Sequence, residues 1–84
     1  MKTKHSKTLV PLFTKPTMAG IRFSDIEALM VALGGEVKEG AGSRVALYLG
    51  DTVKHAHRPH PGKEAKKYQV EEIRAWLEQQ GVTP

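Results

Sequence analysis

The sequence contains no cysteine and no apolar run long enough to span a membrane. The absence of cysteine excludes disulfide bonds and thiolate metal sites, and it suits a cytosolic protein, so we expect a cytoplasmic location. The start of the chain is basic, but its apolar stretch, residues 9–13, is short and is broken by Pro11. We therefore expect neither a signal peptide nor a membrane segment.

The chain is also short, because 84 residues suffice for one domain and leave no room for a second. A core of this size is small and marginally stable, and a partner or a second copy could complete it. We divide the chain into a basic N-terminal arm, residues 1–20, and a folded domain, residues 21–84.

The positive charge is concentrated in two parts of the chain. Thirteen Lys and Arg residues face nine Asp and Glu residues, and the first twenty residues hold four lysines and no acid. A second basic region, residues 44–67, contains Arg44, Lys54, Arg58, Lys63, Lys66 and Lys67 against two acids. This pattern favours a localised anion site over a diffuse basic coat. An ordinary solvated surface with uneven charge remains the alternative.

The N-terminal arm has two interpretations. Leu9, Leu12 and Phe13 have helical spacing, and Thr8 is placed to cap a short helix with Pro11 in its first turn. The arm is then either a helical turn or two that docks its apolar side, or a disordered segment. The sequence does not decide between the two.

Two helices are predicted in the domain. The first spans residues 24–33, begins with a Ser24–Glu27 capping box and ends at Gly34-Gly35. The second spans residues 70–80 and ends at Gly81. Their apolar stripes follow the i, i+3, i+4 pattern of a half-buried helix and comprise Ile26, Leu29, Met30 and Leu33 in the first, and Val70, Ile73, Trp76 and Leu77 in the second.

Three strands are predicted between these helices, over residues 36–39, 44–49 and 52–58. The second and third strands are joined by a two-residue turn at Gly50-Asp51. The predicted fold class is therefore α+β, with the order helix, three antiparallel strands, helix. Both helices would cover one face of the sheet and leave the other face open to a partner.

The two-residue turn also predicts which residues share the open face. It pairs Arg44 with His57, Ala46 with His55, and Tyr48 with Val53. Arg44 and His57 then lie close enough to reach one phosphate, and Tyr48 is placed to stack on a base or simply to cover the sheet.

Three of the four histidines lie within residues 55–60, beside several cations. His55 and His57 point the same way from a strand, and with His60 they could bind a metal, but no carboxylate lies at a supporting spacing. Alternatively, one histidine could deprotonate a ribose 2′-hydroxyl while a cation stabilises the attacked phosphate. A third interpretation is an ordinary polar surface.

Several segments in order resemble HicA toxins, the small bacterial toxins of HicA–HicB toxin–antitoxin pairs. The resemblance covers residues 22–83 and is carried by Phe23-Ser-Asp-Ile-Glu-Ala-Leu-Met, Ala32-Leu-Gly-Gly, Gly42-Ser43, Pro59-x-Pro-x-Lys-Glu and the terminal Leu-Glu-Gln-Gln-Gly-Val. It implies a fold like a double-stranded-RNA-binding domain, metal-independent mRNA cleavage and neutralisation by an antitoxin. The domain 21–84 is thus predicted to be HicA-like.

One position departs from the family pattern. The catalytic histidine of the family follows a Gly-Ser pair at the start of the second strand, whereas here Arg44 follows Gly42-Ser43. Either His57 supplies the imidazole from the neighbouring strand, or this branch has lost cleavage and only binds RNA or a protein partner.

We therefore predict a HicA-like toxin that binds and cleaves mRNA as a metal-independent endoribonuclease, without a cofactor, and pairs with a HicB-like antitoxin. His57 and Arg44 are the predicted catalytic residues. The predicted RNA contacts are Arg44, Tyr48, Arg58, Lys63, Lys66 and Lys67. The alternatives are a non-catalytic RNA- or DNA-binding module and a protein whose open sheet face, with or without an antitoxin as partner, makes only protein contacts.

Overall fold

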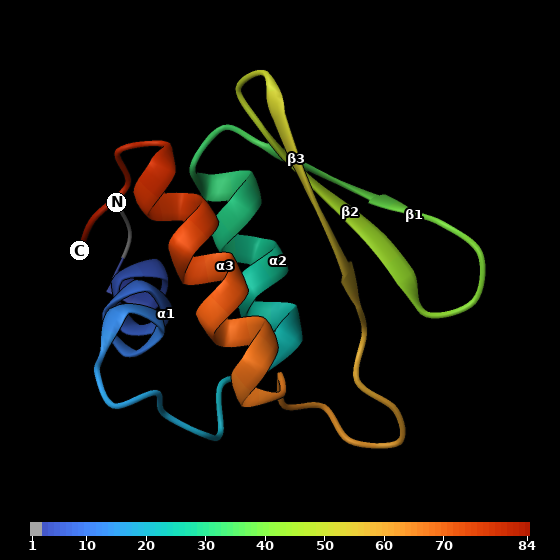
Figure 1. Ribbon diagram of the computed structural model, residues 1–84, viewed down its shortest axis with the longest axis horizontal. Helices are drawn as coiled ribbons and strands as arrows, with labels where there is room; N and C mark the ends of the chain where they lie inside the picture. The colour runs from blue at the N-terminus through green and yellow to red at the C-terminus, as the bar shows by residue number, and fades with distance from the viewer. Residues whose placement is uncertain (1–2) are drawn as a thin grey trace.

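A computed structural model describes residues 3–84, so Met1 and Lys2 of the predicted arm lie outside its described part. The elements in chain order are α1 (Thr3–Phe13), α2 (Phe23–Ala32), β1 (Glu36–Glu39), β2 (Arg44–Leu49), β3 (Thr52–His57) and α3 (Lys67–Gln79). They form three layers: the sheet, then α2 and α3 side by side, then α1 on the far side of these two helices (Figure 1). The predicted α+β fold is confirmed, and α1 is an additional helix.

The sheet has the predicted topology. Its strands are antiparallel in the order β1-β2-β3, so β1 and β3 are both edges. The turn at Gly50-Asp51 sets the predicted register, in which Arg44 faces His57 and Leu49 faces Thr52. Lys54 lies on the face toward the helices. Its charge is paired there, because its Nζ lies 3.2 Å from Glu72 Oε1 on α3.

Both helices that cover the sheet end at the predicted glycines, and the structure shows a Schellman motif at each end. Gly81 has φ +78°, and the N–H of Val82 donates to the carbonyl of Leu77 at 3.0 Å. Gly34 has φ +89°, and the N–H of Gly35 donates to the carbonyl of Met30 at 2.9 Å. Glycine accommodates a positive φ without the steric penalty of a side chain.

The start of α2 differs from the prediction. The helix begins at Phe23, its N-cap residue is Arg22, and no side chain caps it, so the predicted capping box between Ser24 and Glu27 is wrong. Glu27 instead accepts hydrogen bonds from Arg58. A charged partner contributes more to a hydrogen bond than a neutral backbone N–H does, which explains why the carboxylate is used there.

Helix α1 is the docked form of the N-terminal segment, and it is longer than one or two turns. It begins at Thr3, not after a cap at Thr8, and Pro11 lies in its last turn. The Thr8 hydroxyl donates to the carbonyl of Lys4 within the helix at 3.4 Å. These two predicted details, the cap and the position of the proline, are therefore wrong.

One core joins all three layers. Its fully buried large side chains are Leu12, Ile26, Leu29, Met30, Leu47, Val70, Ile73 and Leu77. Both predicted helical stripes contribute to it, and α1 adds Leu9 and Leu12. Among residues 3–84, no helix is both long enough and apolar enough to cross a membrane.

Candidate functional site

The open face of the sheet carries the predicted chemical groups. Arg44, Tyr48, His55 and His57 are exposed on it, in the predicted register. Arg44 and His57 meet at one end of the face, where β2 starts and β3 ends. Tyr48 is four residues along β2 from Arg44, which is about 13 Å in a strand. The face therefore has a cationic histidine end and a separate aromatic end.

Arg44 and His57 form a non-hydrogen-bonded pair of the antiparallel ladder. The flanking bond runs from the N–H of Arg58 to the carbonyl of Ser43 at 2.8 Å, as this type of pair requires. Opposed residues in such a pair have Cα atoms only about 4.5 Å apart, closer than in a hydrogen-bonded pair. The register thus brings the guanidinium and the imidazole to the same end of the same face.

The backbone of His57 faces outward from the sheet edge and is bound by Gln69. The N–H of His57 donates to Gln69 Oε1 at 2.9 Å, and Gln69 Nε2 donates to the His57 carbonyl at 2.8 Å. Gln69 lies in the first turn of α3 and is 4% exposed. Its amide takes the place of a neighbouring strand at this position. No pattern in the sequence indicated this contact, because α3 was predicted to begin only at Val70.

His57 lies between two hollows. One, of about 240 Å³, is lined by Arg44 and His55 together with His57 and two buried strand residues. The other, of about 260 Å³, is lined by Ser43, His57, Arg58, Pro59, His60, Lys66, Tyr68 and Gln69. We call the second hollow the His57–His60 hollow. Two further groups of the basic region, His60 and Lys66, are thus brought to the end of β3.

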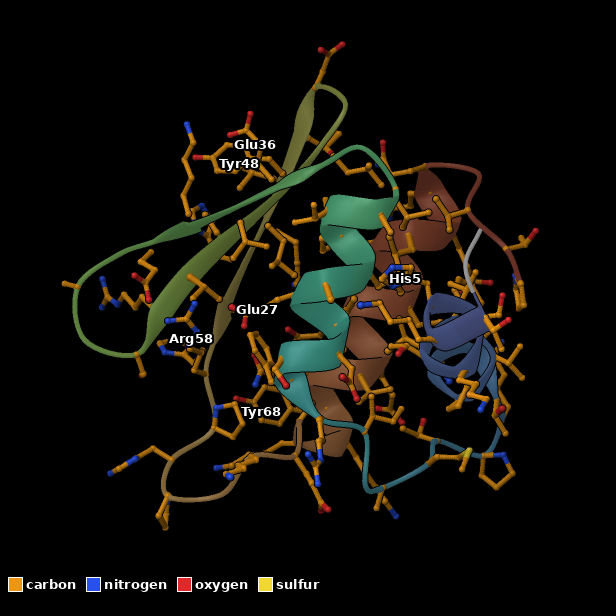
Figure 2. All side chains as sticks on the ribbon, turned by 180° about the vertical axis from the view of Figure 1, so that it is seen from behind. His5, Glu27, Glu36, Tyr48, Arg58 and Tyr68 are labelled. Carbon is orange, nitrogen blue, oxygen red and sulfur yellow. The ribbon has the colours of Figure 1, made fainter. Side chains whose placement is uncertain are left out.

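Arg58 is tied to two carboxylates. Its Nε and Nη2 donate to Glu27 Oε2 at 3.0 and 2.8 Å, and its Nη1 donates to Glu39 Oε1. Figure 2 shows Arg58 and Glu27 pointing toward one another. The hydrogen bonds to Glu39, and then those to Glu27, raise the pKa of Arg58 above its usual value. Sequence reasoning missed both partners, which come from α2 and β1.

The loop after β3 is held at a second point. The N–H of Phe23 donates to the carbonyl of Lys63 at 3.0 Å, and the N–H of Ala65 donates to the carbonyl of Ile21 at 2.7 Å. This short bridge, together with Arg58, fixes both ends of the loop that carries His60. It also places Lys63 in a different hollow, of about 390 Å³, with Arg22 and Arg58.

The remaining predicted RNA contacts lie apart from His57. Tyr48 has Lys38 Nζ 5.1 Å from its ring centroid, a cation–π contact that covers part of the ring. Lys67 is exposed at the start of α3 and lines none of the hollows described above. The structure therefore places Arg44 in one hollow beside His57 and Lys66 in the other. It leaves Tyr48, Lys63 and Lys67 outside both.

The histidines do not form a metal centre with other ligands. Within residues 3–84, no group of three or more His, Asp or Glu side chains is arranged to hold a metal ion. His55 and His57 are two residues apart on the same face of β3, but no carboxylate completes a set with them. Imidazoles surrounded by cations are better suited to a phosphate ligand.

Comparison with known proteins identifies the family. The model of the HicA toxin of bacterial toxin–antitoxin systems matches residues 23–82, from the start of α2 to just beyond α3. No match was found among curated proteins or among solved structures. The matched region contains both helices that cover the sheet and all three strands, and α1 lies outside it. The chain therefore belongs to the HicA toxin family.

Proposed function

We propose that this HicA-family chain is a toxin that binds mRNA beside His57 and cleaves it, and that a HicB-like antitoxin neutralises it in the cytoplasm. The observation that carries the proposal is the close pairing of Arg44 with His57 on an open sheet face. Because Arg44 occupies the position of the family's catalytic histidine, an imidazole from the opposed residue of the next strand is the nearest replacement.

In the proposed reaction, neutral His57 accepts the proton of a ribose 2′-hydroxyl, and the oxygen attacks the adjacent phosphorus. Lys66 holds the phosphate from the His57–His60 hollow. Arg44 adds a second cation from the neighbouring hollow, which His57 also lines. A guanidinium offers two parallel donors to phosphate oxygens, and an ammonium offers a compact charge. These groups supply proton transfer and charge neutralisation, so the proposal includes no metal ion and no other cofactor.

Arg58 has a different role in this proposal from the other predicted RNA contacts. Its guanidinium is already paired with Glu27 and Glu39, so most of its donors are occupied. We assign it to positioning the loop after β3, and we assign phosphate contacts on the surrounding surface to Lys63 and Lys67. Tyr48 lies about two nucleotides farther along the face and is placed to stack on a base.

The test is growth arrest and RNA cleavage by the wild-type chain and two histidine variants. His57→Ala should abolish both, and His5→Ala should leave both unchanged, because His5 belongs to α1 in the layer farthest from the sheet (Figure 2). Full cleavage by His57→Ala would contradict the assignment.

A second candidate function is binding of RNA without cleavage. It is favoured by one departure from the family pattern: Arg44 follows Gly42-Ser43, where the resemblance implies a histidine. In that case the wild-type chain would bind RNA with a steep dependence on salt, yet leave it intact. Gel analysis of bound RNA separates the two functions directly.

A further inference from the structure

A second imidazole, that of His60, shares a hollow with His57. Both residues line the His57–His60 hollow, together with Lys66. His57 approaches from the end of β3, and His60 approaches from the loop that follows it. The His60 side chain is exposed to solvent. A ligand in this hollow would therefore lie beside a histidine from each of two segments and a lysine from the start of α3.

The loop that carries His60 is held at both ends. Arg58, immediately after β3, is bound to Glu27 of α2 and Glu39 of β1. Farther along the loop, the carbonyl of Lys63 accepts from Phe23, the first residue of α2, and the N–H of Ala65 donates to Ile21 just before that helix.

Few residues separate these two anchors, and two of them restrict the backbone further. Pro59 and Pro61 flank His60, and each proline ring fixes its own φ. The backbone at His60 is consequently constrained. A catalytic group that acts on one defined atom needs such a fixed position.

Cleavage of RNA by its own 2′-hydroxyl needs two proton transfers at different oxygens. One group must remove the proton from O2′ as the O2′–P bond forms, and another must supply a proton to O5′ as the P–O5′ bond breaks. One imidazole on one side of the phosphorus cannot serve both oxygens in a single in-line displacement.

We propose that His60, in its protonated form, is the general acid that donates a proton to the O5′ leaving group. This inference rests on the proposed function, in which His57 is the base and Lys66 neutralises the phosphate. The products are a 2′,3′-cyclic phosphate and a free 5′-hydroxyl, and no water is consumed. His57 gains one proton and His60 loses one, and exchange with solvent restores both.

The experiment compares two RNA substrates of one sequence. One is ordinary RNA, and the other has sulfur in place of the bridging O5′ at a single linkage. A thiolate leaves without protonation, so the second substrate needs a base but no acid. His57→Ala should lower cleavage of both substrates.

His60→Ala should lower cleavage of ordinary RNA about 10²–10⁴-fold, the usual contribution of an acid–base group. The same variant should lower cleavage of the sulfur substrate by less than about tenfold. The cleavage rate of the wild-type chain should fall at high pH, because the general acid loses its proton there. This fall should be absent in His60→Ala. The thermal unfolding midpoint of His60→Ala should equal that of the wild-type chain, because the side chain is exposed, and this measurement verifies that the variant is folded.

Three results would overturn the inference. In the first, His60→Ala cleaves ordinary RNA as fast as the wild-type chain, while His57→Ala is inactive. This result would show that His60 is not the general acid, and it would leave the proposed function intact. In the second, His60→Ala lowers the cleavage rate of both substrates by the same factor. This result would assign His60 to substrate binding instead of acid catalysis. The wild-type chain could cleave neither substrate, which overturns the acid and the proposed cleavage together.

Discussion

At the scale of single residues, Gln69 has the most specific contact in the site. His57 belongs to an edge strand, and its outward N–H and carbonyl would face solvent or remain unpaired. The amide of Gln69 offers one acceptor and one donor, which match these two groups at 2.9 and 2.8 Å. The contact fixes the backbone of His57, and therefore the direction of its imidazole, from a buried residue of α3.

Replacement of Gln69 by Leu should lower the free energy of unfolding by about 1–3 kcal/mol, because two part-buried hydrogen bonds to the backbone of His57 are lost. Gln69→Glu should behave differently with pH. A protonated carboxyl still has one donor and one acceptor, whereas a carboxylate has no donor. Burial should also raise the pKa of the new carboxyl above its value in the unfolded chain.

The raised pKa of the new carboxyl in the folded state makes the stability of Gln69→Glu depend on pH. A group with a raised pKa in the folded state binds more protons there, so stability is lost as the pH rises through the window between the two pKa values. We expect Gln69→Glu to approach the stability of the wild-type chain at low pH and to fall toward Gln69→Leu at neutral pH. Urea denaturation at several pH values measures both variants. Parallel curves for Gln69→Glu and Gln69→Leu would contradict the proposed role of the amide.

At the scale of elements, the start of α3 links the fold to the predicted RNA surface. Its first turn carries Gln69, which binds β3, and Lys66 and Lys67 are exposed just before and at its first residue. The helix begins three residues before the predicted Val70, so the same turn that binds the strand also presents two cations. Any movement of α3 would therefore shift Lys66 and His57 together.

The paired change Lys66→Glu and Lys67→Glu should weaken RNA binding equally for all sequences, since lysines that bind phosphate read no bases. The dependence of affinity on salt should also become shallower, by about 0.7 in logarithmic slope for each phosphate of single-stranded RNA that the variant no longer neutralises. Lys4→Glu with Lys7→Glu is the matched control, because these exposed lysines lie on α1 and the charge change is the same. Equal weakening in both double variants would indicate a diffuse basic surface instead of a localised site.

The entry into β1 depends on a glycine for space. A Cβ on Gly35 would overlap the carbonyl oxygen of Tyr48 and lie 3.1 Å from that of Met30, and both obstacles are backbone atoms. Gly35→Ala should therefore lower the free energy of unfolding by about 1–3 kcal/mol. Gly62→Ala is the control, because nothing lies within 4 Å of the added atom. Equal denaturation midpoints for the two variants would show that the backbone around Gly35 moves to accept the Cβ without loss of stability.

At the scale of the whole molecule, the family-matched region does not contain the entire core. Leu12 of α1 has no exposed surface, although α1 precedes the matched residues 23–82. Arg74 of α3, 7% exposed, donates to the carbonyl of Thr14 and to the hydroxyl of Thr17, both at 3.1 Å. These hydrogen bonds attach the segment after α1 to the helix layer. We infer that α1 folds together with the rest of the chain.

Leu12→Ala should accordingly destabilise the whole domain by about 2–5 kcal/mol and leave a single cooperative unfolding transition. Val10→Ala is the control on the same helix, because Val10 is 54% exposed and such surface changes usually stay within about 0.5 kcal/mol. Unfolding in urea, followed through the signal of Trp76 in α3, reports on a residue distant in sequence. An unchanged Trp76 transition in Leu12→Ala would show that α1 is an independent arm.

The local features of this protein were readable from its sequence. Apolar residues at helical spacing located α2 and α3, glycines marked their ends, and the two-residue turn at Gly50-Asp51 determined the register of Arg44 against His57. Each of these depends on neighbours within a few residues, where backbone sterics and periodicity act directly. The catalytic and RNA-binding roles assigned to those residues stay predictions.

The remaining contacts were decided by tertiary structure. Glu27 was predicted to cap its own helix, and it instead binds Arg58, 31 residues away. Gln69 reaches His57 across 12 residues, and Arg74 reaches Thr14 across 60. A polar side chain selects among many partners of similar energy, and only the packing of the elements determines which partner lies within reach. The sequence alone determined α2, α3, the three strands and the register of the second and third strands. The packing of the helices decided that the N-terminal segment forms α1 and which groups surround His57.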